Sequence, residues 1–181
     1  MSSHYRLRDA AREDVSRLVE LLLRMDAHVA GIPRARLRPN AAGWQDLASR
    51  FESLISDDES RVTVATWRGR IVAMGNVRIW RHPDLWHNPE RRGRSVAVID
   101  DVWVEPRHRR RGLAGHLVAE LVSFAVSRGV QDLMLEYSAS NEEAESAWSS
   151  LGFRPTGVRA EASAGDVMRR LGRVPREEDE A

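Results

Sequence analysis

A strand that runs into a long helix through an arginine-rich turn is the most constraining feature of this sequence. Residues Ser95–Val104 are rich in β-branched side chains and predict a strand, which Pro106 ends. Residues Gly112–Arg128 carry apolar side chains at helical spacing and predict an amphipathic helix, which Gly129 ends. Backbone N–H groups at such a helix start lack acceptors and face the positive end of the helix dipole. The segment therefore predicts a site for phosphate groups.

The rest of the chain alternates between extended and helical patterns. Apolar periodicity and turn residues predict further strands over residues 4–8, 61–67, 71–80, 133–135 and 153–159, and helices over about 11–28, 43–55 and 141–150. One more strand near Val167 is an alternative. Because a run of strands precedes the alternation with helices, the order predicts a mixed sheet with helices on both faces. The fold class is α/β, in the α/β or α+β range, and not a doubly wound Rossmann sheet.

Composition bounds the domain count and the chemistry. The 181 residues predict a single domain over residues 1–172, followed by an acidic tail over residues 173–181 that we expect to be disordered. The chain has no cysteine, and all of its 28 basic residues other than histidine are arginines. This composition excludes a cysteine nucleophile, a Schiff-base lysine, disulfides and a P-loop, whose motif needs lysine.

Three segments, in order and at familiar spacing, resemble the GCN5-related N-acetyltransferase (GNAT) family. Residues Arg109–Ala114 match that family's Arg/Gln-x-x-Gly-x-Gly/Ala signature. Residues Ile99–Pro106 resemble its fourth strand, in an acidic-pair form similar to polyamine acetyltransferases. Residues Asn141–Phe153 resemble its Asn-x-x-Ala-x-x-x-Tyr-x-x-x-Gly-Phe segment. The resemblance covers about residues 61–159 well and implies a central, mixed, mostly antiparallel sheet flanked by helices.

The resemblance also implies where acetyl-CoA, the family's cosubstrate, would bind. Backbone groups of the fourth strand would bond the pantetheine arm, and amides at the helix start would hold the pyrophosphate. Asn141 would bond the arm near the splay between the fourth and fifth strands, and Trp148 could pack against the cofactor. The implied cofactor-binding residues are Val102, Trp103, Val104, Arg109, Arg110, Arg111, Gly112, Leu113, Ala114, Gly115, Asn141 and Trp148.

Direct transfer to an amine needs a base, and three carboxylates are candidates. Asp100 and Asp101 rank together, ahead of Glu136 on the fifth strand. Successive strand residues face opposite sides, so we expect only one of the two aspartates to line the acceptor site. The usual acid for the leaving thiolate is a tyrosine of the Asn-x-x-Ala segment, but Trp148 stands at that position, and an indole N–H is not a usable acid. Tyr137 or water is the alternative.

The resulting hypothesis is an acetyl-CoA-dependent N-acetyltransferase acting on a small molecule. The acceptor would be the primary amine of an amino acid, a polyamine or an amine-bearing antibiotic. The composition of the loop before the fourth strand, with Arg81, Arg91, Arg92 and Arg94, would also suit an acceptor with a carboxylate or phosphonate. A protein N-terminal or lysine acetyltransferase and a CoA-binding regulatory module with little turnover are alternatives, the second because of Trp148.

Less specific interpretations compete with several of these assignments. The arginines at positions 107, 109, 110 and 111 could form only a solvated turn, and Asp100 and Asp101 could be salt-bridged. Asn141 could cap a helix, and Trp148 could be an ordinary core residue. His82 and His87 lie five residues apart in a loop without a convincing third ligand, so we expect no metal site.

Charge and hydropathy give the remaining expectations. A formal net charge of +1 argues against nucleic acid as a partner. No apolar run approaches the ~20 residues of a membrane span, and the N-terminus lacks the apolar stretch of a signal peptide, so we expect no membrane partner and a cytoplasmic protein. A homodimer is an expectation from the family, in which dimers are common.

Overall fold

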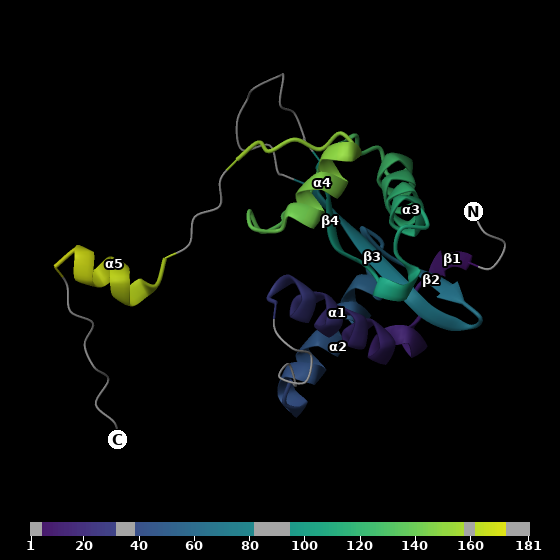
Figure 1. The fold of residues 1–181 in the computed structure, drawn as a ribbon, viewed down its shortest axis with the longest axis horizontal. Coiled ribbons are helices and arrows are strands. Elements are labelled where there is room, and N and C mark those ends of the chain that lie inside the picture. Colours follow the sequence, from purple (N-terminus) through teal and green to yellow (C-terminus); the bar gives the residue numbers. More distant parts are fainter. Residues whose placement is uncertain (1–4, 32–38, 82–94, 158–161, 173–181) are drawn as a thin grey trace. The chain divides into compact units, whose positions relative to one another are not determined.

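The computed structural model describes residues 5–31, 39–81, 95–157 and 162–172. The chain forms two compact units, one from Met1 to Ser138 and the other from Ala139 to Ala181. The first unit holds the sheet and three helices, and the described part of the second unit holds two helices (Figure 1).

Every helix and strand predicted in the first unit is confirmed. Its elements are β1 (Tyr5–Asp9), α1 (Val15–Val29), α2 (Ala41–Ser56), β2 (Ser60–Trp67), β3 (Arg70–Arg81), β4 (Ser95–Val104), α3 (Leu113–Ser127) and β5 (Asp132–Met134). Short 3-10 turns over Arg12–Asp14 and Pro106–His108 precede α1 and follow β4. The tight turn between β2 and β3 has left-handed backbone at Arg68 and Gly69, a conformation that glycine adopts readily.

The five strands form one sheet in the order β1-β2-β3-β4-β5. β1, β2, β3 and β4 pair antiparallel with their neighbours, whereas β4 and β5 are parallel. The parallel pairing follows from α3, because this helix carries the chain from the end of β4 back to the level at which β4 begins, and β5 then runs in the same direction as β4. The expected mixed, mostly antiparallel sheet is therefore confirmed.

Helices cover both faces of this sheet, as predicted (Figure 1). Val62 and Val64 of β2 pack in one buried cluster with α1 and α2, while Ala65 packs on the opposite face with Leu113 and Leu117 of α3. This change of face follows the two-residue period of a strand.

α3 approaches the sheet closely at Gly75 of β3. A Cβ atom there would lie 3.1 Å from Cδ1 of Leu121, a side chain that is fully buried. The glycine therefore provides the space in which the middle of α3 packs against β3, and so it fixes the depth at which the helix sits on the sheet.

The described part of the second unit contains α4 (Glu142–Ser150) and α5 (Ala164–Arg170). α4 is the helix predicted over residues 141–150. The strand predicted over residues 153–159 is absent from its described part, residues 153–157, and residues 158 and 159 lie outside the described residues. The alternative strand near Val167 is wrong, because Val167 lies in α5, whose start is capped by the Ser163 hydroxyl accepting from the Asp166 N–H.

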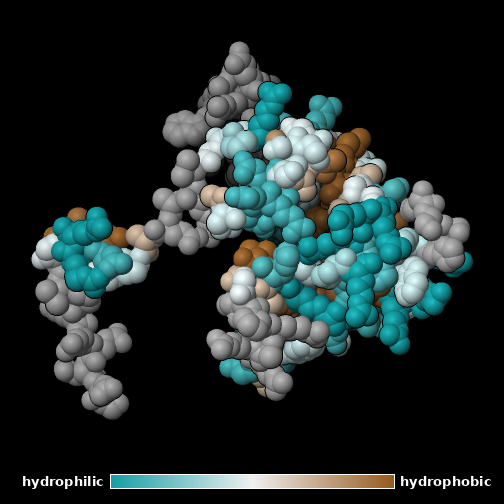
Figure 2. Space-filling view, viewed as in Figure 1, coloured by the Kyte–Doolittle hydropathy of each residue, from teal (hydrophilic) through white to brown (hydrophobic). Residues whose placement is uncertain are grey.

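Hydrophilic side chains cover much of the face of the molecule seen in Figure 2, with apolar groups between them. Among the described residues, no helix is long and apolar enough to cross a membrane.

Candidate active site

β4 has an open edge beside β5. The two strands pair only from Val96 to Val98 of β4, opposite Asp132–Met134. β5 ends at Met134, so Ile99–Val104 of β4 have no strand partner on that side among the described residues. This open edge corresponds to the splay between the fourth and fifth strands that the family resemblance implied, and its unpaired backbone groups can bond an extended ligand.

A β-bulge interrupts β4 at the middle of this open edge. Met74 of β3 pairs with Trp103 and Asn76 pairs with Asp100, so Asp101 and Val102 stand opposite the single residue Gly75. Asp101 has left-handed backbone, with φ of 52°. Such a bulge disrupts the ladder and re-aims neighbouring side chains, so the strict alternation expected for Asp100 and Asp101 does not hold here.

The carboxylate of Asp101 is held by two side chains. Arg50 of α2 donates to it over 2.6 Å, and Asn76 of β3 donates over 2.8 Å. Asn76 is itself 98% buried, since only 2% of its surface is exposed. Asp101 is therefore a fixed, ion-paired group, which is the salt-bridged alternative that the sequence left open for the pair.

Asp100 is in a different state from its neighbour. Its carboxylate makes no hydrogen bond or ion pair with another described residue. Burial raises the pKa of its carboxyl group above the ordinary value, and the negative charge of Asp101 raises it further, against the opposing effect of Arg50 and Arg78. A carboxylate with an elevated pKa and a free lone pair is a better proton acceptor than one in an ion pair.

Two further acids lie near this pair. Glu136 is close enough for its charge to contribute to the raised pKa of Asp100. Asp26 is exposed as a residue of α1, yet partial burial of its carboxyl group and, next, the charge of Asp101 raise its pKa. The open edge of β4 is therefore bordered by an excess of carboxylates, which favours a positively charged ligand.

The loop between β4 and α3 presents a row of free backbone amides. Among the described residues, none of the N–H groups of Arg110–Gly115 donates a backbone hydrogen bond outside the helix. Arg110 and Gly112 have left-handed backbone, with φ of 57° and 75°. A turn of this kind at a helix start gathers N–H groups around an anion. A Cβ atom at Gly115 would meet nothing within 4 Å, so a ligand can approach the backbone there.

The arginines of this segment do not all face one ligand. Arg109 donates from Nε to the carbonyl of Val104 over 3.0 Å and lies over the Trp103 ring. It therefore fastens the loop to the end of β4. Arg107 and Arg111 line a hollow beyond β4, together with residues of β1 and α1.

A comparison with protein families decides what this arrangement is. The model of the acetyltransferase (GNAT) family matches residues 18–153, more than half of the chain. The chain belongs to the GNAT family. The resemblance carried by the three motif segments is thus confirmed.

Curated relatives of this GNAT protein include two ribosomal protein bS18-alanine N-acetyltransferases. The one from Salmonella typhimurium is 38% identical over 63 residues, and the one from Escherichia coli K12 is 36% identical over the same length. Each alignment covers 35% of this chain and 43% of the relative. This chain thus matches less than half the length of these relatives.

Solved GNAT structures share the fold over most of the chain. A predicted acetyltransferase with acetyl-CoA from Clostridium acetobutylicum has a TM-score of 0.72 at 19% identity, covering 88% of this chain and 96% of that one. A glucosamine-6-phosphate N-acetyltransferase from Arabidopsis thaliana has a TM-score of 0.64 at 20% identity, covering 88% and 98%. An aminoglycoside acetyltransferase from an uncultured soil sample has a TM-score of 0.64 at 21% identity, covering 91% and 99%.

Two of the predicted site residues lie in the second unit. Asn141 caps α4, because its side-chain oxygen accepts from the N–H of Ala144 over 3.1 Å. This confirms the capping interpretation for Asn141. Trp148 of α4 is half-buried and packs edge-on against Phe153, with ring centroids 5.4 Å apart. Their predicted contacts with a cofactor stay predictions.

Glu136 and Tyr137 follow β5 rather than lying in it, because β5 ends at Met134. The expectation that Glu136 sits on the fifth strand is therefore wrong. Glu136 is exposed, whereas Tyr137 is half-buried.

Sequence reasoning missed the side chains that hold the bulge. Arg50, Asn76 and Asp26 belong to other elements, and no spacing in the sequence links them to Asp101. Two signals were available. A Gly-Asn pair interrupts the apolar run of β3, and an Asp-Asp pair interrupts β4, where aspartate tolerates left-handed backbone better than valine does.

The loop that carries His82, His87, Arg91, Arg92 and Arg94 lies outside the described residues. Elsewhere, in the part of the chain that the structure describes, no group of three or more possible ligand side chains is placed to hold a metal ion.

Proposed function

We propose that this GNAT protein transfers the acetyl group of acetyl-CoA to the primary amine of a small molecule. The observation that carries the proposal is the bulge in β4, where unpaired Asp100 lies beside an open strand edge that leads to the free amides of Arg110–Gly115. One continuous surface of the first unit thus offers a base, an extended-ligand edge and an anion cradle.

The residues present fit acetyl-CoA. The amides of Arg110–Gly115 would hold its pyrophosphate, and the open edge at Val102, Trp103 and Val104 would bond its pantetheine arm. When bound, acetyl-CoA supplies an acetyl group activated as a thioester. The hydrogen bond from Arg109 to the carbonyl of Val104 would hold this loop in position for the pyrophosphate.

Asp100 is the proposed base. An amine attacks only when neutral, so a carboxylate must accept a proton from the ammonium form, directly or through water. Burial and, next, the charge of Asp101 raise the pKa of Asp100, which makes its carboxylate a stronger proton acceptor than that of an ordinary aspartate. Asp101 acts as a positioning residue, because Arg50 and Asn76 hold it and so hold the bulge. Glu136 stays the lower-ranked alternative base.

The thiolate leaving group needs a proton or a donor. Trp148 replaces the usual tyrosine and offers only an N–H donor. We assign the proton to water or to Tyr137, as the sequence suggested.

The charge of the site favours a cationic acceptor. Asp26, Asp100, Asp101 and Glu136 outnumber Arg50 and Arg78 around the bulge. This balance supports a polyamine or an amine-bearing antibiotic above a plain amino acid. An acceptor with a carboxylate was an alternative because of several arginines, and Arg81 is one of them. Arg81 donates to Glu59 over 2.9 Å and 3.0 Å, so its guanidinium is already paired and supports that alternative less.

A protein acceptor is the second candidate. The curated relatives are named for alanine of a ribosomal protein, which supports an N-terminal amine as the acceptor. An N-terminal amine is also a cation near neutral pH, so the acidic border of the site is compatible with it.

The test is thiol release from acetyl-CoA over two matched panels. One panel holds polyamines, aminoglycosides and free amino acids, and the other holds peptides with N-terminal alanine or internal lysine. Because the chain has no cysteine, a thiol reagent reports CoA alone. We expect kcat/KM for the best small amine to exceed that for any peptide by about tenfold or more. The reverse order would establish the protein acceptor, and no turnover on either panel would overturn both.

A further inference from the structure

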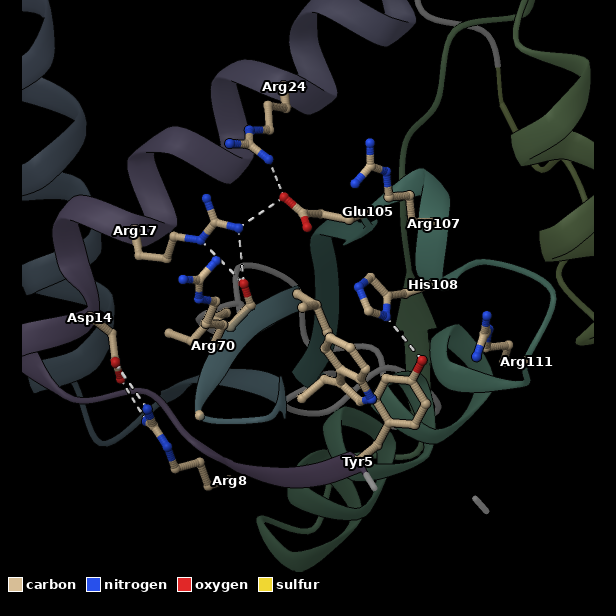
Figure 3. Close-up of a pocket in the computed structure, with 14 residues that line it drawn as sticks. Tyr5, Arg8, Asp14, Arg17, Arg24, Arg70, Glu105, Arg107, His108 and Arg111 are labelled. Carbon is tan, nitrogen blue, oxygen red and sulfur yellow. Dashed lines mark hydrogen bonds and ion pairs between the residues drawn. The ribbon is translucent and has the colours of Figure 1, made fainter. Parts of the chain in front are cut away.

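A hollow of about 820 Å³ lies beyond the end of β4, away from the open edge. It is lined by residues of β1, α1, the turn between β2 and β3, the first residues of β3, and the segment that joins β4 to α3 (Figure 3). Its size falls within the ~300–1,000 Å³ of small-molecule sites. None of the proposed acceptor-site residues lines it.

Positive charge dominates this arginine hollow. Six arginines line it, against the carboxylates of Asp14 and Glu105. Three of the arginines have carboxylate partners. Arg8 binds Asp14 through two hydrogen bonds of 2.6 Å and 2.9 Å, and Arg17 and Arg24 both donate to Glu105 (Figure 3).

The other three arginines have no such partner. The side chains of Arg70, at the start of β3, and of Arg107 and Arg111, from the segment after β4, make no hydrogen bond or ion pair with any described residue. They therefore bring uncompensated charge to a concave surface from two separate segments. An anion would relieve the repulsion among them.

One wall of the hollow is aromatic and rigid. The Tyr5 hydroxyl and Nδ1 of His108 are 2.9 Å apart, and the His108 ring also packs against Trp67, with centroids 5.3 Å apart. Burial, and next the charges of Arg111 and Arg107, lower the pKa of His108, against the opposing effect of Glu105. His108 thus serves as a neutral wall residue near pH 7, and it holds the backbone between Arg107 and Arg111 in place.

We infer that the arginine hollow binds a small phosphorylated anion at a site separate from the acetyl-CoA cradle. A guanidinium presents a planar fork of N–H donors that matches phosphate oxygens. Arg70, Arg107 and Arg111 stand at separate places around the hollow (Figure 3), so an anion that carries several phosphate oxygens suits them better than a single carboxylate, which offers two. Arg111 belongs to the loop of the cradle, so an anion in the hollow would contact the loop that holds the cofactor.

Isothermal titration calorimetry with inorganic pyrophosphate tests this inference without using activity. The protein is first saturated with CoA, so that the cradle is filled, and about 0.15 M salt screens non-specific attraction. We expect pyrophosphate to bind the wild type and to bind Arg70→Gln about tenfold more weakly. Arg12→Gln is the matched control, because Arg12 is an exposed arginine that does not line the hollow. The affinity for CoA, measured separately, should be the same in all three proteins.

Three other results would overturn the inference. Equal pyrophosphate binding to the wild type, Arg70→Gln and Arg12→Gln would mean non-specific attraction. Loss of pyrophosphate binding in the presence of CoA, with recovery when dephospho-CoA replaces it, would assign the hollow to the 3′-phosphate of the cofactor. Loss with both cofactors would place all anion binding in the cradle. An inactive protein that shows the expected binding pattern would sink the proposed function and leave this inference standing.

Discussion

Asp100 carries a charge that the fold disfavours. Its pKa is raised by burial and by Asp101, and no described residue donates a hydrogen bond to its carboxylate. Residues kept in such a state at a cost to stability are typical of functional sites. We expect Asp100→Asn to lower kcat by about 10²–10⁴-fold while leaving the affinity for CoA unchanged. Thiol-release kinetics measure kcat, and a binding titration with CoA measures the affinity.

The pH dependence of the same variant has a definite sign. The folded pKa lies above the ordinary value, so ionised Asp100 destabilises the fold at neutral pH, and the effect vanishes below about pH 3.8, where both states are protonated. Asp100→Asn should therefore raise Tm at pH 7 and not at pH 3. Asp58→Asn, at an exposed aspartate outside the site, is the control for both kinetics and Tm. Wild-type turnover in Asp100→Asn would move the base to Glu136 or Asp101.

The two glycines of the cradle serve different purposes. Gly112 has φ of 75°, which costs an alanine about 1–2 kcal/mol, whereas Gly115 lies in the first turn of α3 with open space around it. We expect Gly112→Ala to lower Tm and to raise KM for acetyl-CoA. Gly115→Ala should leave Tm unchanged or raise it slightly, and still raise KM, because the new methyl group occupies the approach to the amides. An unchanged KM in Gly115→Ala would exclude close approach of the cofactor there.

At the scale of elements, the start of α1 depends on one buried carboxylate. Asp14 accepts from the Ala11 N–H over 2.8 Å and from both terminal nitrogens of Arg8. The hydrogen bond from Arg8 lowers the pKa of Asp14, against the effect of burial, and the Ala11 N–H adds to the lowering. The carboxylate thus ties β1 to the 3-10 turn that opens α1.

This anchor predicts a pH-dependent loss of stability. A lowered folded pKa stabilises the fold above about pH 3.8, and the contribution disappears as pH falls through the folded pKa. We expect Asp14→Asn to cost about 1–3 kcal/mol of unfolding free energy at pH 7 and less at pH 3. Urea denaturation at the two pH values measures this. Glu13→Gln, in the same turn but exposed, should change stability by less than about 1 kcal/mol, and equal losses in both variants would refute the anchor.

At the scale of the whole molecule, the two compact units can unfold together or separately. We expect residues 1–172 to unfold as a single domain and the acidic residues 173–181 to contribute nothing to it. A variant that ends at Gly172 should match the full chain in Tm and in kcat. Scanning calorimetry should show one transition for both proteins, and two resolved transitions would mean that residues 1–138 and 139–181 are separate folding units.

Local patterns predicted most of the fold because they depend on neighbours in the chain. The β-branched run of β4 and the apolar stripe of α3 identified both elements nearly to the residue. The failures are at the C-terminal side. Val167 is a β-former by type, yet it lies in α5, where the Ser163 cap and the arginines of the last turn favour a helix. In that short segment, capping outweighs the preference of one residue.

Some features of the candidate site follow from local sequence and others follow from the tertiary structure. The sequence alone predicted the loop of free amides between β4 and α3, because small residues and a helix start are properties of a contiguous segment. Phosphate binding by this loop stays a prediction. Only the tertiary structure separated Asp100 from Asp101, which are adjacent and chemically identical. Arg50 and Asn76, brought from α2 and β3, pair with one of them and leave the other unpaired with a raised pKa. Only the tertiary structure, too, turned Arg109 onto β4 and Arg107 and Arg111 into the hollow. Charge pairing and burial depend on residues far apart in the chain, and no local spacing encodes them.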